Sequence, residues 1–337
     1  MVTRRGFLKT AAAVAGVGAV QQMAWSTGAW AQQKPWRIVL FTKNVVNPIM
    51  KLFQVGAKVS LDRFKDHPME LNYAAPTKPE NIEEQTRILE DWITKKPDVI
   101  ILLPVDYVAQ VPVVQKAVAA GIPIVNYSNR MAAGKVEIYI GFDDEQLAYD
   151  VARYAFKAVG NKGNVVILDG VPGAITAQDR HRGWLRALRD TKGMELLAAQ
   201  PANYARLQAM QVMENLLQRF PEIDVVLAAN DEEALGAIEA IDAAGRLGKI
   251  KVTGCDATQP GVQAILQGRL FVSVDYSGFD QGYLAAEAAY RILKGEKVPS
   301  ELLLPIVLVD KSNAAQYNVP PEQRKPPVWD KVLAAQK

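Results

Sequence analysis

The sequence predicts an α/β fold made of doubly wound parallel sheets. Short runs of Val, Ile and Leu alternate with longer amphipathic segments along most of the chain. Most of the short runs contain at least three consecutive apolar residues, which is typical of parallel strands buried on both faces. The strand candidates also outnumber the strands of a typical open sheet. We therefore expect two sheets, each covered by helices and forming one lobe.

The expected elements follow one another in a regular order. The strand candidates are Arg37–Thr42, Met69–Ala74, Val99–Leu103, Pro123–Tyr127, Val136–Gly141, Val165–Asp169, Met194–Ala199, Val225–Ala229, Lys251–Gly254, Leu270–Val274 and Leu303–Val309. The helix candidates include Pro79–Lys95, Val108–Ala120, Glu145–Val159, Leu207–Gln218 and Glu232–Ala244. This alternation implies right-handed crossovers within each sheet. Because no Pro/Ser-rich linker separates two halves, strands that cross a narrow waist should join the lobes as a hinge.

The first 31 residues have the pattern of an export signal. A charged segment, Thr3–Lys9, precedes a moderately apolar one, Thr10–Val20, and a small-x-small cleavage site at Ala29–Ala31. The paired arginines resemble a twin-arginine signal. We expect cleavage after Ala31 and a mature protein in the periplasm. The apolar segment is too short to span a bilayer, and no later segment is long enough, so we expect no membrane insertion of the mature chain.

Charge and composition exclude several classes of function. Arg4, Arg5 and Lys9 account for the formal charge of +3, so the mature chain is close to neutral and lacks the charge expected for binding nucleic acid. Cys255 is the only cysteine, which rules out an intramolecular disulfide and a thiolate metal cluster. Neither histidine lies in a nucleophile–base pattern, and the dinucleotide and P-loop fingerprints are absent. We expect no cofactor, no metal and no enzymatic activity.

Polar residues follow many of the strand candidates. In an open parallel sheet, ligands bind at the carboxyl ends of the strands. The residues in question are Lys43, Asn47, Asn129, Arg130, Asn230, Asp231, Asp256, Asp275 and Tyr276. Amides, a carboxylate and an arginine fork together suit vicinal hydroxyl groups, each of which donates and accepts. For Asn47 and Asp231, helix capping is an equal alternative to ligand contact.

Six segments, in order, resemble the ribose-type periplasmic binding proteins. They are Lys43–Pro48, Gly121–Val125 with the following Asn129 and Arg130, Asp169–Trp184, Gln200–Tyr204, Ala229–Ala237 and Gly254–Asp256. The resemblance covers essentially the whole mature chain. It implies the type I periplasmic binding protein fold, in which two Rossmann-like lobes close on a sugar.

The strand-end pattern and the resemblance together indicate ten ligand-binding residues. These are Lys43, Asn47, Met50, Asn129, Arg130, Arg180, Tyr204, Asn230, Asp256 and Tyr276. By resemblance, Asn129 and Arg130 take the place of an Asp-Arg pair that grips sugar hydroxyls, and Asp256 is the ligand carboxylate. Ile49 and Met50 stand where the family often has stacking aromatics, which leaves Tyr204 on the other face, with Tyr276 as a second candidate.

The charges of these residues leave the ligand class open. If Lys43, Arg130 and Arg180 all face the cleft, only Asp256 opposes three cations, which favours an acidic ligand such as a sugar acid. If Lys43 instead points to solvent, or pairs with Asp256 or Asp106, the pocket suits an ordinary neutral sugar.

The sequence therefore predicts an exported solute-binding protein that captures a sugar, polyol or sugar acid in an interlobe cleft. It would deliver this ligand to an inner-membrane ABC permease, and we expect a monomer that diffuses to it. The expected lobes are residues 35–143 plus 277–306 and residues 144–276 plus 307–337. A sensory receptor of the same fold is the alternative, and a periplasmic enzyme is a more distant one.

Overall fold

A computed structural model describes residues 33–336 of the chain. Contacts within the backbone divide the chain into residues 1–34 and residues 35–337, and all the helices and strands below belong to the second part. The expected signal sequence and its cleavage site after Ala31 lie outside the described residues. In the described part of the chain, no helix is both long and apolar enough to cross a membrane.

Strands and helices alternate along the described chain. The strands are β1 (Trp36–Phe41), β2 (Met69–Ala74), β3 (Val99–Leu102), β4 (Ile124–Tyr127), β5 (Ile138–Gly141), β6 (Gly163–Asp169), β7 (Met194–Pro201), β8 (Val225–Ala228), β9 (Lys251–Thr253), β10 (Ser273–Asp275), β11 (Glu301–Leu303) and β12 (Val307–Val309). The α-helices are α1 (Pro48–Arg63), α2 (Ile82–Lys95), α3 (Val111–Ala119), α4 (Asp144–Ala158), α5 (Ile175–Arg189), α6 (Arg206–Arg219), α7 (Asp231–Ala243), α8 (Gln259–Leu266), α9 (Gly278–Leu293) and α10 (Trp329–Ala334), and two 3₁₀ turns, η1 (Ala314–Tyr317) and η2 (Pro321–Gln323), lie near the C-terminus.

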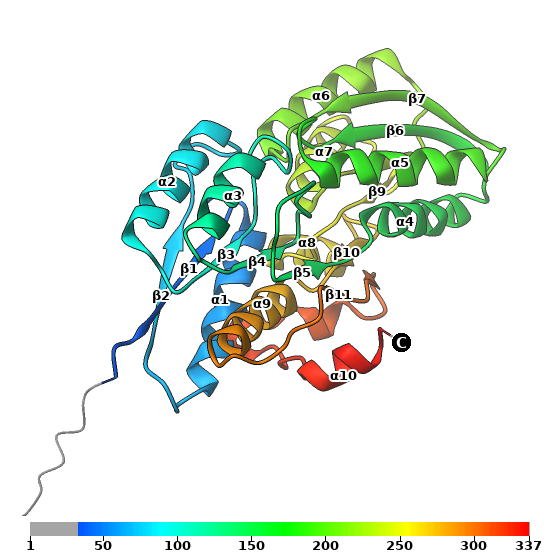
Figure 1. Ribbon diagram of the computed structural model, residues 1–337. Helices are drawn as coiled ribbons and strands as arrows, with labels where there is room; N and C mark the ends of the chain where they lie inside the picture. The colour runs from blue at the N-terminus through cyan, green and yellow to red at the C-terminus, as the bar shows by residue number, and fades with distance from the viewer. Residues whose placement is uncertain (1–32, 337) are drawn as a thin grey trace, which may run out of the picture. The chain divides into compact units, whose positions relative to one another are not determined.

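The strands form two parallel sheets and a small antiparallel pair (Figure 1). The first sheet has the order β11-β5-β4-β3-β1-β2, and the second has the order β7-β6-β8-β9. Every neighbouring pair in these two sheets is parallel, whereas β10 and β12 pair antiparallel. The predicted α/β fold with doubly wound parallel sheets is therefore confirmed.

Both faces of each sheet are buried under helices. In β1, Ile38 and Leu40 join the apolar core beneath α1 and α9, while Val39 and Phe41 join a separate core beneath α2 and α3. The two helix pairs lie on opposite sides of this sheet in Figure 1. The second sheet is covered in the same way by α6 and α7 on one face and by α4 and α5 on the other. Because successive side chains of a strand point to opposite faces, this burial explains the uninterrupted apolar runs.

Near the C-terminus, the structure corrects two strand predictions. The predicted strand Leu303–Val309 is two strands, because Pro305 lacks the N–H that a continuous ladder needs. Its first part, β11, extends the first sheet, and its second part, β12, pairs with β10. In place of the predicted strand Leu270–Val274, the structure has a shorter strand, β10, that begins later in the chain, at Ser273. Before it, Val272 forms only a single parallel bridge, to Thr253. The chain thus passes between the two sheets three times, after β5, after β10 and between β11 and β12.

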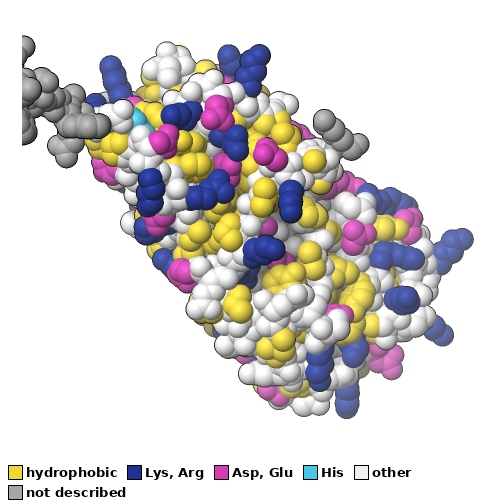
Figure 2. Space-filling model, turned by 90° about the horizontal axis from the view of Figure 1, so that it is seen from below, with side chains coloured by type: hydrophobic (Ala, Val, Ile, Leu, Met, Phe, Trp, Pro, Cys, Tyr) yellow, Lys and Arg dark blue, Asp and Glu magenta, His cyan; other side chains and the backbone are white. Residues whose placement is uncertain are grey.

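Charges of both signs are mixed on the surface shown in Figure 2. Lys and Arg side chains alternate with Asp and Glu side chains across this face, with apolar side chains between them. A protein that binds the phosphate backbone of nucleic acid gathers positive charge along one stripe. The face shown carries no such stripe, in agreement with the near-neutral charge of residues 32–337.

Candidate functional site

A pocket lies at the carboxyl ends of strands from both sheets, where an open parallel sheet places its ligands. It is lined by Lys43, Asn47, Ile49, Met50, Phe53, Glu80, Leu103, Ser128, Asn129, Thr176, Arg180, Tyr204, Asn230, Asp256 and Tyr276. Nine of the ten residues that the sequence indicated are in this set. The tenth, Arg130, is not.

The side chain of Arg130 points away from the pocket. Its guanidinium binds the carboxylate of Glu301 at 2.5 Å, lies over the ring of Tyr139 and remains half exposed. Ser128 has a positive φ of 58°, and this tight turn directs Asn129 inward, where its Nδ2 donates to a backbone carbonyl at 3.1 Å. The pair that contributes to the pocket is therefore Ser128 and Asn129, one residue earlier than the resemblance indicated. In this structure, Arg130 therefore does not line the pocket, in contrast to the prediction from the sequence.

This shift of one residue can be tested with two alanine variants. Asn129→Ala should weaken binding of the ligand by about 3- to 10-fold, because a neutral hydrogen bond contributes roughly 0.5–1.5 kcal/mol. Arg130→Ala should leave the affinity within about twofold, because an exposed ion pair contributes little. Isothermal titration of both variants measures the difference. A larger loss in Arg130→Ala than in Asn129→Ala would contradict this placement.

Asn47 and Asn230 each cap a helix and also keep a side-chain amide that can donate a hydrogen bond in the pocket. The Oδ1 atoms of Asn47 and Asn230 each accept a backbone N–H of the helix that they precede, at 3.1 and 2.9 Å. The amide Nδ2 of each remains available, and that of Asn230 is buried without a partner. Capping and ligand contact are therefore compatible in the same side chain. Asp231, in contrast, is saturated by Thr258 and Ser273 and links elements of the protein itself.

Asp256 is the buried carboxylate of the pocket. Its backbone has a φ of 121°, a strained value that is typical of functional sites in a residue other than glycine. Its Oδ2 is buried without a hydrogen-bond partner. Burial and the negative charge of Asp231 raise the pKa of Asp256 well above its ordinary value, against the influence of Arg180 and a hydrogen bond from Tyr276. The ring of Tyr276 is stacked on Phe142 at 4.4 Å between centroids, which fixes its position.

Arg180 forms a buried wall of the pocket. Its Nε donates to Asp144 at 2.8 Å, and its Nη1 donates to the carbonyl of Ala229. The side chains of Arg180 and Asp144 are each only 5% exposed, so the ion pair is almost fully desolvated. Burial raises the pKa of Asp144 to about 6, although the adjacent guanidinium opposes this rise. The cation of Arg180 is thus already balanced by a protein carboxylate.

Tyr204 presents an aromatic ring to the pocket from the second sheet. Its backbone has a φ of 58° and is held by the buried carboxylate of Glu233, which accepts the Tyr204 N–H at 2.6 Å. Its Oη lies 3.0 Å from Oγ1 of Thr176. A Cβ atom at Gly170 would come within 2.2 Å of the ring, so the ring position requires glycine there. These contacts fix an aromatic surface suited to stacking on a ligand ring.

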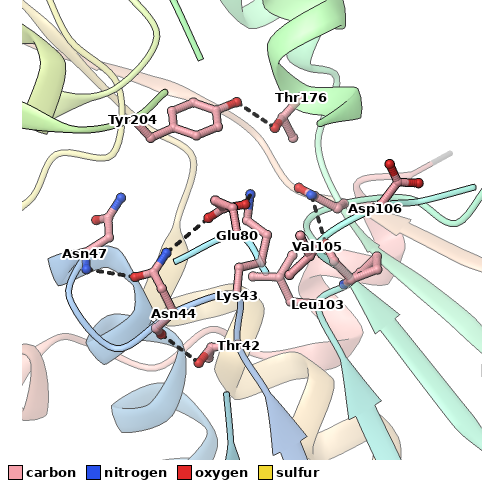
Figure 3. A network of polar contacts seen from close by, with 12 residues as sticks. Thr42, Lys43, Asn44, Asn47, Glu80, Leu103, Val105, Asp106, Thr176 and Tyr204 are labelled. Atoms are coloured by element: carbon pink, nitrogen blue, oxygen red, sulfur yellow. Dashed lines mark hydrogen bonds and ion pairs between the residues drawn. The ribbon is translucent and has the colours of Figure 1, made fainter. Parts of the chain in front are cut away.

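Lys43 pairs with Glu80 rather than with Asp256 or Asp106. The two charged atoms are 3.1 Å apart, and Lys43 also lies over the Tyr204 ring. Figure 3 shows Lys43 and Glu80 opposite Tyr204. Of the three cations that could have faced the cleft together, Arg130 is not on the lining, and Lys43 and Arg180 are paired. The structure therefore favours the second of the two alternatives, in which Lys43 is paired, although its partner is Glu80.

Six residues of the pocket were not among the predicted contacts: Ile49, Phe53, Glu80, Leu103, Ser128 and Thr176. Glu80 lies in the loop after β2, and Thr176 lies in the first turn of α5, the helix that follows β6, so a stricter application of the strand-end rule would have found both. No pattern marked Phe53 and Leu103, which look like ordinary core residues. Within residues 33–336, no cluster of three or more His, Cys, Asp or Glu side chains is placed to hold a metal ion.

Comparisons with known proteins agree with this geometry. A family profile described as "Periplasmic binding protein domain" matches residues 38–297. The D-ribose/D-allose-binding protein of Pseudomonas aeruginosa is 32% identical over 270 residues, which cover 78% of this chain and 84% of the relative. An ABC transporter periplasmic solute binding protein from Actinobacillus succinogenes 130z, solved with D-allose, has a TM-score of 0.79 at 32% identity and covers 84% of this chain and 100% of its own. An ABC transporter solute binding protein from Bacillus halodurans C-125, solved with myo-inositol, has a TM-score of 0.79 at 28% identity, with 85% and 98% covered.

Proposed function

The chain belongs to the periplasmic binding protein family, and from this premise we propose that it captures a small carbohydrate and delivers it to an ABC importer. The observation that carries the proposal is a pair of unsatisfied groups in one pocket. Nδ2 of Asn230 and Oδ2 of Asp256 are both buried, and neither has a hydrogen-bond partner. Buried polar groups are normally paired, so a donor and an acceptor left unpaired in one pocket are available to the polar groups of a ligand.

Hydroxyl groups of a ligand supply both kinds of partner. A hydroxyl oxygen can accept a hydrogen bond from Asn230, and a hydroxyl hydrogen can be donated to the carboxylate of Asp256. Asn47 and Asn129 offer further amides, and the ring of Tyr204 offers an apolar face. This combination matches a polyhydroxylated ring, which has polar edges and apolar C–H faces.

Binding requires the pocket to enlarge. The cavity volume is about 40 Å³, which admits water but not a sugar ring. We propose that residues 35–143 plus 277–306 form one lobe and residues 144–276 plus 307–337 the other, and that the three connections between the sheets act as the hinge. Ligand would bind to the open form, and closure would bring both lobes onto it.

The relatives favour uptake over sensing. The relative from P. aeruginosa is named for binding ribose and allose, and both solved structures are described as solute binding proteins of ABC transporters. By analogy, the mature protein would act in the periplasm after twin-arginine export and would meet an inner-membrane permease. Because the relatives are binding proteins, we propose that this chain releases its ligand chemically unchanged.

Calorimetric titration of purified residues 32–337 tests the proposal. The panel contains D-ribose, D-allose, D-glucose, D-galactose and myo-inositol, with amino acids as controls. We expect saturable binding of at least one carbohydrate with a stoichiometry of one, and recovery of that compound unaltered after incubation. Binding of an amino acid without any carbohydrate, or conversion of the carbohydrate to a product, would contradict the proposal.

A further inference from the structure

The pocket contains an ion pair whose negative partner, Glu80, the sequence did not indicate. Nζ of Lys43 lies 3.1 Å from Oε2 of Glu80, and the two side chains are only 7% and 12% exposed. Both residues come from loops of the first sheet, and they face Tyr204 and Thr176 of the other sheet across the pocket (Figure 3). A ligand that fills the pocket would therefore contact this pair directly.

The carboxylate of Glu80 is held in place by the adjacent loop. Its Oε1 accepts a hydrogen bond from Nδ2 of Asn44 at 3.1 Å, while Oδ1 of Asn44 accepts the backbone N–H groups of Val46 and Asn47. The backbone of Glu80 has a positive φ of 56° and donates its N–H to the carbonyl of Lys43. The backbone and the side chain of Glu80 are thus both tied to the loop that carries Lys43. The charge of Lys43 is neutralised by a fixed partner.

The charges that line the pocket leave no cation for a ligand. Arg180 is already paired with the buried Asp144, and Lys43 is paired with Glu80. The remaining charged group on the lining is the carboxylate of Asp256, which is buried and open on one oxygen. A carboxylate on the ligand would meet this negative charge without an unpaired cation to balance it, and such an uncompensated buried charge is strongly disfavoured.

We infer that the pocket selects neutral carbohydrates over the corresponding sugar acids, and that Glu80 determines this selectivity by neutralising Lys43. The inference rests on the proposed function and specifies its ligand class. Replacing Glu80 with glutamine removes the negative charge but keeps Oε1 as an acceptor for Asn44. Lys43 would then be an unpaired cation that faces the ligand, and the variant should accept acids.

The experiment compares matched ligands that differ only in one oxidised carbon. Wild-type protein and variants are titrated with D-glucose and D-glucuronate, and with D-galactose and D-galacturonate. Within the pair of ligands that it binds most tightly, wild type should bind the neutral sugar with an affinity at least about tenfold higher than that for the acid. Glu80→Gln should reduce this preference about tenfold or reverse it, and Lys43→Met/Glu80→Gln should restore it. Glu90→Gln is the matched control, because Glu90 forms a Lys–Glu pair with Lys116 on the exposed surface, and it should behave as wild type.

Each result decides the inference. A wild-type preference for the acid, or an unchanged preference in Glu80→Gln, would overturn it while leaving a carbohydrate-binding protein. If no carbohydrate, neutral or acidic, binds to wild type or variants, the proposed function fails and the inference fails with it. If Glu80→Gln does not fold, Lys43→Met provides the test. This variant leaves Glu80 as an unpaired carboxylate that faces the ligand, so it should weaken binding of the acid more than binding of the neutral sugar. An equal loss for both would overturn the inference.

Discussion

Asp256→Asn should weaken carbohydrate binding by about 10- to 100-fold or more, and it should not lower the thermal stability of the free protein. A hydrogen bond to a buried charged acceptor contributes roughly 1.5–3 kcal/mol, and the amide lacks that charge. Burial raises the pKa of Asp256, so its ionised form costs folding free energy that the neutral amide avoids. Titration calorimetry and thermal unfolding measure the two effects on the same sample.

Asp242→Asn is the matched control for this variant. Asp242 is half exposed and pairs with Arg269 at 2.9 Å on the surface. Its replacement should change neither affinity nor unfolding temperature appreciably. Equal affinities for wild type and Asp256→Asn would contradict the role of Asp256 as the ligand carboxylate.

The same carboxylate predicts how binding depends on pH. A ligand hydroxyl donates to the ionised form, and the raised pKa means that Asp256 takes up a proton at a higher pH than an ordinary aspartate. Affinity should therefore fall on acidification, and the fall should begin at a higher pH than an ordinary aspartate would produce. Asp144 has a pKa of about 6 and can also titrate on acidification, so the comparison with Asp256→Asn is necessary. The part of the pH dependence that is absent in Asp256→Asn is due to the titration of Asp256.

Arg180→Met should destabilise the protein by about 3–5 kcal/mol, in addition to weakening binding. Removing one partner of a buried ion pair leaves the other as an uncompensated charge, here the carboxylate of Asp144. Chemical denaturation of wild type and variant measures this loss. Below a pH of about 6, Asp144 is mostly protonated and needs no cationic partner, so the destabilisation should be smaller at pH 5 than at pH 8.

A double variant separates the structural role of Arg180 from its role in binding. In Arg180→Met/Asp144→Asn, no buried charge is left unpaired, and most of the lost stability should return. Binding should remain weak, because the guanidinium is still missing from the pocket wall. Recovery of affinity together with stability would show that Arg180 acts only as a partner of Asp144.

Much of the fold could be predicted because each strand is buried on both faces. The apolar runs Ile38–Phe41 in β1, Val99–Leu102 in β3 and Val225–Ala228 in β8 have no polar interruptions, and the end of each such run locates the edge where ligands bind. The exceptions lie where the chain passes between the sheets. There the strands are only three residues long, as in β10 and β12, and a run of this length carries too little pattern to define its partner.

The sequence could predict which loops form the candidate site more readily than it could predict which side chains of those loops point into it. Asn230 and Asp256 lie within a few residues of the ends of β8 and β9, so their positions were determined locally. The direction of Arg130 depends on the tight turn at Ser128 and on Glu301, which is 171 residues away. No local pattern could show that this side chain turns outward to the surface.

The amino-acid sequence alone determined the alternation of strands and helices, the sheet edge that holds the pocket and most of the side chains that reach it. These properties follow from periodicity and from residues adjacent along the chain. Only the tertiary structure decided the electrostatics of the pocket. Lys43 is paired with Glu80 and Arg180 with Asp144, and each pair joins residues about 36 positions apart. Whether a charge is available to a ligand depends on which groups lie within a few ångströms in space, and that is a property of the folded chain.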